Sequence, residues 1–302
     1  MKCTRPNYAL DLGIKENGAR NIKFLPKRPD LYSLRQLSAR YGKENILPLP
    51  CGKCLACKLA HAKEWAVRCT LEALYHEDNY FLTITYDDDH LPENGLLNRR
   101  DLTLFLKRLR ARCGSFRYFG CGEYGSKTKR PHYHLLIFGL SLSDLKPVGN
   151  GLYESKVLKL LWPYGFHYLG SVNYSSANYV AQYTTKKIFN DCSDEFLAAS
   201  TMPGIGYQWC KDHLGKVLEY DAVFGDFGSS KAVKMPRYFE KMAEVLDSSK
   251  YVEVKQKRLD KSTAFQFNEM LIHACEQVED LNAYKERCLI DDYIGQKKGS
   301  RL

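Results

Sequence analysis

Apolar residues recur at spacings of three and four in several stretches of this 302-residue chain, and that period is typical of helices that face a core. The spacing predicts a helix from about residue 55, a second over 100–114 and a third over 175–189. Further helical patterns extend from about 236 to 289. The chain is therefore expected to bury several amphipathic helices.

Polar residues indicate where two of these helices begin. Asp101 is expected to cap the second helix, because its side chain can accept from a free backbone N–H of the first turn, and Gly114 is expected to end it. Ser175 or Ser176 is expected to cap the third helix for the same reason.

Short runs rich in aromatic and β-branched residues predict strands over 80–89, 116–125, 132–139 and 165–172. These strands and the helices do not alternate in a regular βαβ order. A mostly antiparallel sheet with flanking helices, an α+β fold, is therefore predicted.

The two ends of the chain differ from this middle part. Residues 1–50 contain five prolines and are expected to be irregular. We predict three parts: a Cys-rich segment over 1–60 that packs on the core, a core over 61–210, and a mainly helical extension over 211–302.

Positive charge is concentrated in one stretch. The net charge is +10, and ten Lys and Arg residues lie between Gly95 and Leu135 against only Asp101 and Glu123. Such a concentration favours a polyanionic partner, of which nucleic acid is the commonest, although a solvated face accounts for the charge alone equally well. The predicted DNA contacts are Arg108, Arg112, Lys127, Lys129 and Arg130.

The eleven cysteines cannot all pair with one another, because their number is odd. The first residues lack the apolar region of a signal peptide, and no run reaches the roughly 18 apolar residues of a membrane helix. We therefore expect a reducing, cytoplasmic setting and no membrane partner. Clustered cysteines in such a setting bind metal more often than they form disulfides.

The stretch CGKCLAC places Cys51, Cys54 and Cys57 at a spacing that lets three thiolates surround one ion. A structural Zn²⁺ would need a fourth ligand. Cys3 is the first choice, and His61 and Cys69 are alternatives. An iron–sulfur site, or reduced cysteines that serve as small apolar residues, would also fit the spacing.

A polar pattern interrupts the strand at 132–139. His132 and His134 share one face, because side chains alternate along a strand, and both imidazoles can converge on one ion. Glu123, at the end of the preceding strand, can reach the same ion across an antiparallel pair. Two imidazoles and a carboxylate with open positions suit catalytic Mg²⁺ or Mn²⁺. Two ordinary polar positions on an exposed face are the alternative.

Tyr179 and Tyr183 lie four residues apart on the third predicted helix and share a face, and Lys186 and Lys187 flank it. A phenol becomes a nucleophile when its proton is withdrawn or its anion is stabilised, and a neighbouring cation does the second. Packing of an aromatic pair into a core is the alternative. The stretch GCGEYGSKT departs from the phosphate-binding loop pattern, so no nucleoside triphosphate site is predicted.

Three motifs in this order, FLTITY, PHYHLLIFG and YVAQYTTKK, resemble those of the HUH endonucleases, the rolling-circle replication initiators. The two-tyrosine form resembles the initiators of the Microviridae, and CGKCLACKLAHAKEWAVRC and PGIGYQW resemble the gokushovirus branch. The resemblance covers roughly residues 50–210 and Cys3. It implies an antiparallel sheet of about five strands on a ferredoxin-like plan.

The resemblance also implies roles for the residues. His132, His134 and Glu123 would hold the catalytic ion, Tyr183 would be the first nucleophile, and Tyr179 the second. A tyrosine would cut single-stranded origin DNA, leaving a 5′-phosphotyrosine and a free 3′-hydroxyl. Rejoining would then release a circular genome. A host helicase and polymerase would be partners, in the cytoplasm of the infected bacterium.

Two other classes of protein stay open from the sequence. A zinc-stabilised DNA-binding regulator without activity accounts for the charge and the cysteines but gives the histidines and tyrosines no task. A relaxase or single-strand transposase of the same superfamily shares the chemistry. The order of the motifs, with the tyrosines after the His strand, favours an initiator.

Overall fold

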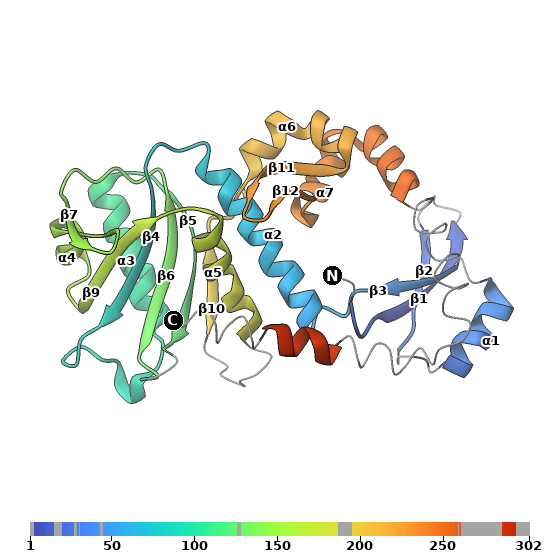
Figure 1. Ribbon diagram of the computed structural model, residues 1–302, viewed down its shortest axis with the longest axis horizontal. Coiled ribbons are helices and arrows are strands. Elements are labelled where there is room, and N and C mark those ends of the chain that lie inside the picture. Colours follow the sequence, from blue (N-terminus) through green and yellow to red (C-terminus); the bar gives the residue numbers. More distant parts are fainter. Residues whose placement is uncertain are drawn as a thin grey trace. The chain divides into compact units, whose positions relative to one another are not determined.

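The computed structural model describes residues 3–14, 20–26, 29, 31–42, 45–125, 128–186, 195–258, 260 and 286–293 (Figure 1). The chain divides into two compact units. Unit 1 comprises Met1–Ala60 with Lys255–Leu302, and unit 2 comprises His61–Val254. The three-part division expected from the sequence stays a prediction.

Unit 1 contains a three-stranded antiparallel sheet in the order β2-β1-β3 and one helix. Its elements are β1 (Asn7–Ile14), β2 (Arg20–Phe24), α1 (Leu31–Tyr41) and β3 (Ile46–Leu49). The prediction that residues 1–50 are irregular is therefore wrong. Proline is tolerated here because β3 is an edge strand, on which Pro48 lies opposite Tyr8.

Unit 2 is built on a seven-stranded antiparallel sheet in the order β10-β5-β6-β4-β9-β8-β7. Its strands are β4 (Asn79–Tyr86), β5 (Arg117–Tyr124), β6 (Pro131–Phe138), β7 (Leu145–Gly149), β8 (Leu152–Ser155), β9 (Gly165–Ser171) and β10 (Phe196–Ala199). The α+β class is confirmed. The sheet exceeds the predicted five strands because β7, β8 and β10 extend its edges, and each is too short to show a period in sequence.

Helices cover both faces of this sheet. On one face, α3 (Arg99–Cys113) and α4 (Lys156–Leu161) pack on Leu82, Leu135 and other buried residues of the central strands. On the other face, α5 (Tyr174–Lys186) and the unit 2 part of α2 (Leu55–Ala73) pack on Phe119 and Leu136. Figure 1 shows α3 and α5 on opposite sides of the sheet. The central strand β6 is buried from both sides.

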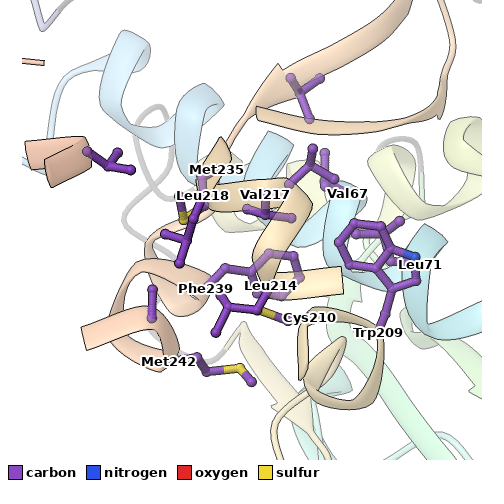
Figure 2. Close-up of a cluster of buried hydrophobic side chains, with 14 of the residues drawn as sticks. Val67, Leu71, Trp209, Cys210, Leu214, Val217, Leu218, Met235, Phe239 and Met242 are labelled. Atoms are coloured by element: carbon purple, nitrogen blue, oxygen red, sulfur yellow. The ribbon is translucent and has the colours of Figure 1, made fainter. Parts of the chain in front are cut away.

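The rest of unit 2 forms a second apolar cluster after the sheet. Its elements are α6 (Tyr207–Tyr220), the hairpin of β11 (Ala222–Phe227) and β12 (Ser230–Lys234), and α7 (Arg237–Leu246). Figure 2 shows how Trp209 and Phe239 of this region lie with Val67 and Leu71 of α2. None of the described helices is both long enough and apolar enough to cross a membrane.

Helix starts differ from those expected. The Asn98 side chain caps α3 by accepting from the Arg100 N–H at 3.0 Å, whereas Asp101 accepts from the Tyr86 hydroxyl at 2.9 Å. At the start of α5, Asn173 Oδ1 accepts from the Ser176 N–H at 2.9 Å and Ser176 Oγ accepts from the Asn173 N–H at 2.9 Å. Each cap thus begins before the serine or aspartate that sequence favoured. A short 3₁₀ turn, η2 (Glu93–Gly95), precedes α3.

Candidate active site

Three neighbouring strands bring the predicted metal ligands to one end of the sheet. β5 pairs with β6 so that Glu123 lies opposite His132, and β4 pairs with β6 so that Thr83 lies opposite His134. Directly opposed residues of an antiparallel pair point to the same face. All four side chains therefore lie on the face that α5 covers, with Leu136 continuing the same row into the core.

The carboxylate of Glu123 stands between the two imidazoles. Glu123 Oε1 lies 3.0 Å from the Nε2 atom of His132 and 3.0 Å from the Nε2 atom of His134. The two imidazole rings are nearly perpendicular, at 83°, with centroids 4.9 Å apart. Glu123 is 2% exposed and His134 6% exposed, so the group is shielded from water from below and opens at His132.

The outer nitrogens of the two rings fix how the inner ones face the carboxylate. His132 Nδ1 lies 3.0 Å from the Arg130 carbonyl, which can only accept, so Nδ1 carries the proton. Burial lowers the pKa of His132 and lowers that of His134 to about 3, helped in the latter by the charge of His132. Both rings are neutral at pH 7. The unprotonated Nε2 atom of His132 then faces a carboxylate oxygen.

Two electron pairs facing each other at this distance call for a cation, and the donor set fits one. In octahedral coordination with bonds of about 2.1 Å, as for Mg²⁺, adjacent ligand atoms lie about 3.0 Å apart. The two Nε2–Oε1 distances have that value. The three residues offer ligand atoms within 4.8 Å of one another. The residues present therefore suit a divalent ion that keeps open positions.

Glycine lets β5 and β6 approach closely behind this group. A Cβ atom on Gly120 would lie 2.5 Å from the His134 carbonyl oxygen and 2.3 Å from the Leu135 side chain. A Cβ atom on Gly122 would lie 2.8 Å from the ring of Phe196 on β10. The first conflict is with backbone, which cannot move without shifting the strand. Gly120 thus sets the spacing at which Glu123 meets the histidines.

The two predicted nucleophiles lie against this group. The rings of Tyr179 and Tyr183 have centroids 5.4 and 5.5 Å from that of His134, and 5.1 Å from each other. Tyr183 stacks on His134 at 14°. Burial, together with the neighbouring Tyr179, raises the pKa of Tyr183, whereas the Tyr179 side chain is 46% exposed. One helix thus presents both phenols beside the candidate metal ligands.

The predicted basic residues are distributed over several surfaces. Arg130 donates to the Tyr86 carbonyl at 2.9 Å and pairs with Asp88, so it anchors the β5–β6 loop to the end of β4. Lys129 is exposed in that loop. Arg108 and Arg112 belong to α3, on the face of the sheet away from the histidines.

Some of these basic positions cannot be placed in full. Lys127 and Lys187 lie outside the described residues, and Lys186 is described as the last residue of α5 but not in its side chain. Their predicted roles stay predictions.

The four predicted zinc ligands come together in unit 1, with the sulfurs of Cys3, Cys51, Cys54 and Cys57 within 4.8 Å of one another. The alternatives have other surroundings. His61 Nε2 accepts from the Trp65 indole N–H at 3.1 Å, and Cys69 is fully buried in the apolar cluster beneath α5.

Sequence reasoning missed the partners that hold the site in place. Thr83 Oγ1 lies 2.9 Å from His134 Nδ1, and Phe81 stacks on the His134 ring at 5.6 Å. Both belong to the FLTITY stretch, where a threonine within an apolar strand was the only signal of such a role. Phe166 and Tyr168 of β9 were also missed as exposed aromatics on the same sheet face, although their alternation with His167 was visible.

Comparison with known proteins bears directly on this site. The profile of a family of viral replication-associated proteins, described by its member ORF2, matches residues 79–188, from β4 to just beyond α5. The chain is 34% identical over 248 residues to the replication-associated protein ORF2 of Spiroplasma virus 4, covering 72% of this chain and 76% of that protein. It is 33% identical over 242 residues to the replication-associated protein VP4 of Bdellovibrio phage phiMH2K, covering 74% and 75%.

A third similarity, to the replication-associated protein ORF4 of Chlamydia phage 1, is 36% identity over 164 residues, which is 50% of this chain and 41% of that protein. No solved structure matches the chain. The fold and these similarities define a viral protein of DNA replication. The chain belongs to the replication-associated protein ORF2 family, and the family resemblance carried by the three motifs is confirmed.

Proposed function

We propose that the protein initiates rolling-circle replication by cutting single-stranded origin DNA with a tyrosine and later rejoining the ends. One observation carries this proposal: two tyrosines of α5 lie against His134, which with His132 and Glu123 forms a donor set suited to a divalent ion. A protein that only bound DNA would not need buried ion ligands beside two phenols.

Glu123, His132 and His134 would hold Mg²⁺ or Mn²⁺. When bound, the ion would offset the charge that builds on the phosphate oxygens during transfer. The buried carboxylate lowers the net charge of the loaded site, and the neutral imidazoles add none. The open side at His132, which is less buried than His134, leaves room for a phosphodiester.

The chain's own nucleophiles account for the transfer. The phenol oxygen of one tyrosine forms a bond to phosphorus as the bond from phosphorus to the 3′-oxygen breaks. The phenol loses a proton and the 3′-oxygen gains one, so the step is balanced and conserves the ester bond. Tyr183 is proposed to act first and Tyr179 second, with Lys186 and Lys187 stabilising the phenolates. The attack of a released 3′-hydroxyl on the first linkage closes the circle.

The exposed aromatics of β9 give a path for the DNA. Tyr168 lies opposite Thr83, which lies opposite His134, and Phe166 continues the face one row along. Two strand spacings separate β9 from β6, roughly 10 Å. Phe166 is 51% exposed and Tyr168 38% exposed, and bases of a single strand stack on such rings. We propose that nucleotides next to the scissile phosphate rest there.

The remaining partners follow from this chemistry. A free 3′-hydroxyl is a primer, so a host polymerase would extend it, and a host helicase would separate the strands. The reaction would take place in the cytoplasm of the infected bacterium, as expected for a relative of phage replication proteins.

The test uses purified protein, Mg²⁺ or Mn²⁺, and a pool of single-stranded oligonucleotides tiled across the phage genome. A covalent protein–DNA adduct is expected, and it should be lost in Tyr179→Phe with Tyr183→Phe. Tyr174→Phe is the matched control, because Tyr174 lies on α5 but packs against Phe227. An adduct that persists in the double variant rejects the nucleophiles, and full cleavage by His132→Ala with His134→Ala rejects the metal ligands.

A further inference from the structure

Unit 1 has very little apolar core. Among its described residues the buried side chains are Ala9, Leu10, Cys54, Leu55, Ala56 and Tyr293. Half of these are alanine or cysteine, which contribute little buried area. Small units of this kind usually need a covalent or metal crosslink in addition to hydrophobic burial.

A group of four thiols lies where such a crosslink would act. Cys3 Sγ lies 3.7 Å from Cys54 Sγ, and Cys51 Sγ lies 4.0 Å from Cys57 Sγ. All four sulfurs lie within 4.8 Å of one another. In a tetrahedral site with Zn–S bonds of about 2.3 Å, neighbouring sulfurs are separated by about 3.8 Å. We propose that these four cysteines bind one structural Zn²⁺ that holds unit 1 together, independently of the proposed nuclease.

The fold explains why the fourth ligand comes from so far along the chain. β1 and β3 are antiparallel, with Asn7 opposite Leu49, so the segment before β1 runs alongside the segment after β3. That register brings Cys3 to Cys51, whose backbone N–H donates to Cys3 Sγ at 3.3 Å. The ion would therefore fasten the start of β1 to the end of β3.

The turn between Cys51 and Cys54 has the features of a thiolate-binding loop. Gly52 adopts a left-handed φ of +72°, which turns the chain so that two later N–H groups face the first sulfur. The Lys53 N–H donates to Cys51 Sγ at 3.4 Å and the Cys54 N–H at 3.3 Å. Such N–H groups stabilise a thiolate acceptor. Cys57 lies in the first turn of α2, where the helix dipole also favours negative charge.

Zinc is the metal that this donor set favours. Four thiolates without imidazole or carboxylate form a closed site, which is typical of structural Zn²⁺. An iron–sulfur cluster places sulfide and several iron atoms between its thiolates, so its cysteine sulfurs lie farther apart than these do. The cysteines other than these four in the described parts of the chain, such as Cys69 and Cys113, do not join the group.

The test measures metal content in tag-free protein purified without chelator. About one zinc per chain is expected, and cobalt-substituted protein should show the visible bands of a tetrahedral ion and strong thiolate-to-cobalt charge transfer. Cys51→Ser with Cys54→Ser should lose the metal. Cys113→Ser is the control and should keep it, because Cys113 lies at the end of α3 in unit 2.

A second measurement keeps the proposal testable if the double variant folds poorly. Wild-type protein treated with a mercurial and a chelator should release the zinc, and protease should then cleave within residues 3–60 while residues 61–254 stay protected. Folded wild-type protein with less than half a zinc per chain, with iron and sulfide in its place, or with a Cys3–Cys54 disulfide would overturn the proposal. So would unchanged zinc content in the double variant.

Discussion

Thr83→Val should weaken metal binding without removing a metal ligand. Thr83 Oγ1 is the partner of His134 Nδ1 at 2.9 Å, and it holds the ring so that Nε2 faces Glu123. Valine keeps the shape and suits a strand, so the change removes only the hydrogen bond. A buried ring N–H left without a partner costs about 1–3 kcal/mol, and loss of such an outer partner typically lowers metal affinity about 10- to 100-fold.

The assay is a titration of adduct formation with Mn²⁺, paired with the electron paramagnetic resonance signal of free Mn²⁺, which measures binding without activity. The half-saturating concentration should rise about 10- to 100-fold in Thr83→Val, with adduct yield largely restored at saturation. Thr85→Val is the matched control. It lies on the same strand and face, but its hydroxyl makes only a 3.4 Å bond to the Pro131 carbonyl. Equal half-saturation in Thr83→Val, Thr85→Val and wild type would refute the reasoning.

Three further predictions follow from contacts in unit 2. Gly120→Ala should destabilise the fold and reduce adduct formation more than Gly122→Ala, because only the former meets backbone of β6. His167 is buried with a lowered pKa, and its Nε2 accepts from a backbone N–H at the end of β8 at 3.0 Å. The unfolded state therefore binds the extra proton, and stability should fall as pH drops below about 6.5, less steeply in His167→Gln. Phe166→Ala and Tyr168→Ala should each weaken single-stranded DNA binding by about 1–3 kcal/mol and leave Mn²⁺ affinity unchanged.

Each of these has a clear contrary result. Equal thermal stability of the two glycine variants would show that β5 and β6 can separate without cost. Parallel stability–pH curves, from chemical denaturation of wild type and His167→Gln, would remove His167 as the titrating group. Unchanged affinity in fluorescence anisotropy with labelled oligonucleotides would move the DNA path away from β9.

Much of the central sheet could be predicted from the sequence because its strands are long and strongly patterned. The strand of His132 and His134 and the helix of the two tyrosines are found close to their predicted ranges. The meeting of Glu123 with both histidines followed from one assumption, that consecutive strands pair in an antiparallel hairpin, and the register confirms that pairing. Local alternation and one short loop were enough for this part.

The rest depended on contacts between distant segments. Thr83 could not be assigned as the partner of His134, because a sequence does not show that β4 lies beside β6 rather than beside β5. The small sheet of unit 1 was missed because prolines suggested irregular chain, whereas edge strands accept them. Asn98 replaced Asp101 as a cap because Tyr86, a residue of another strand, engages that aspartate.

The most direct test of the proposed nuclease is to map the residue that is covalently joined to DNA. Protein incubated with Mn²⁺ and the tiled single-stranded oligonucleotides is digested with trypsin and nuclease, and the peptides are sequenced by mass spectrometry. The prediction is a 5′-phosphate ester on Tyr183 or Tyr179, both of which lie in the tryptic peptide 160–186. A nucleotide linked to any other residue, or through its 3′ end, would contradict the account, as would folded, metal-loaded protein that forms no adduct.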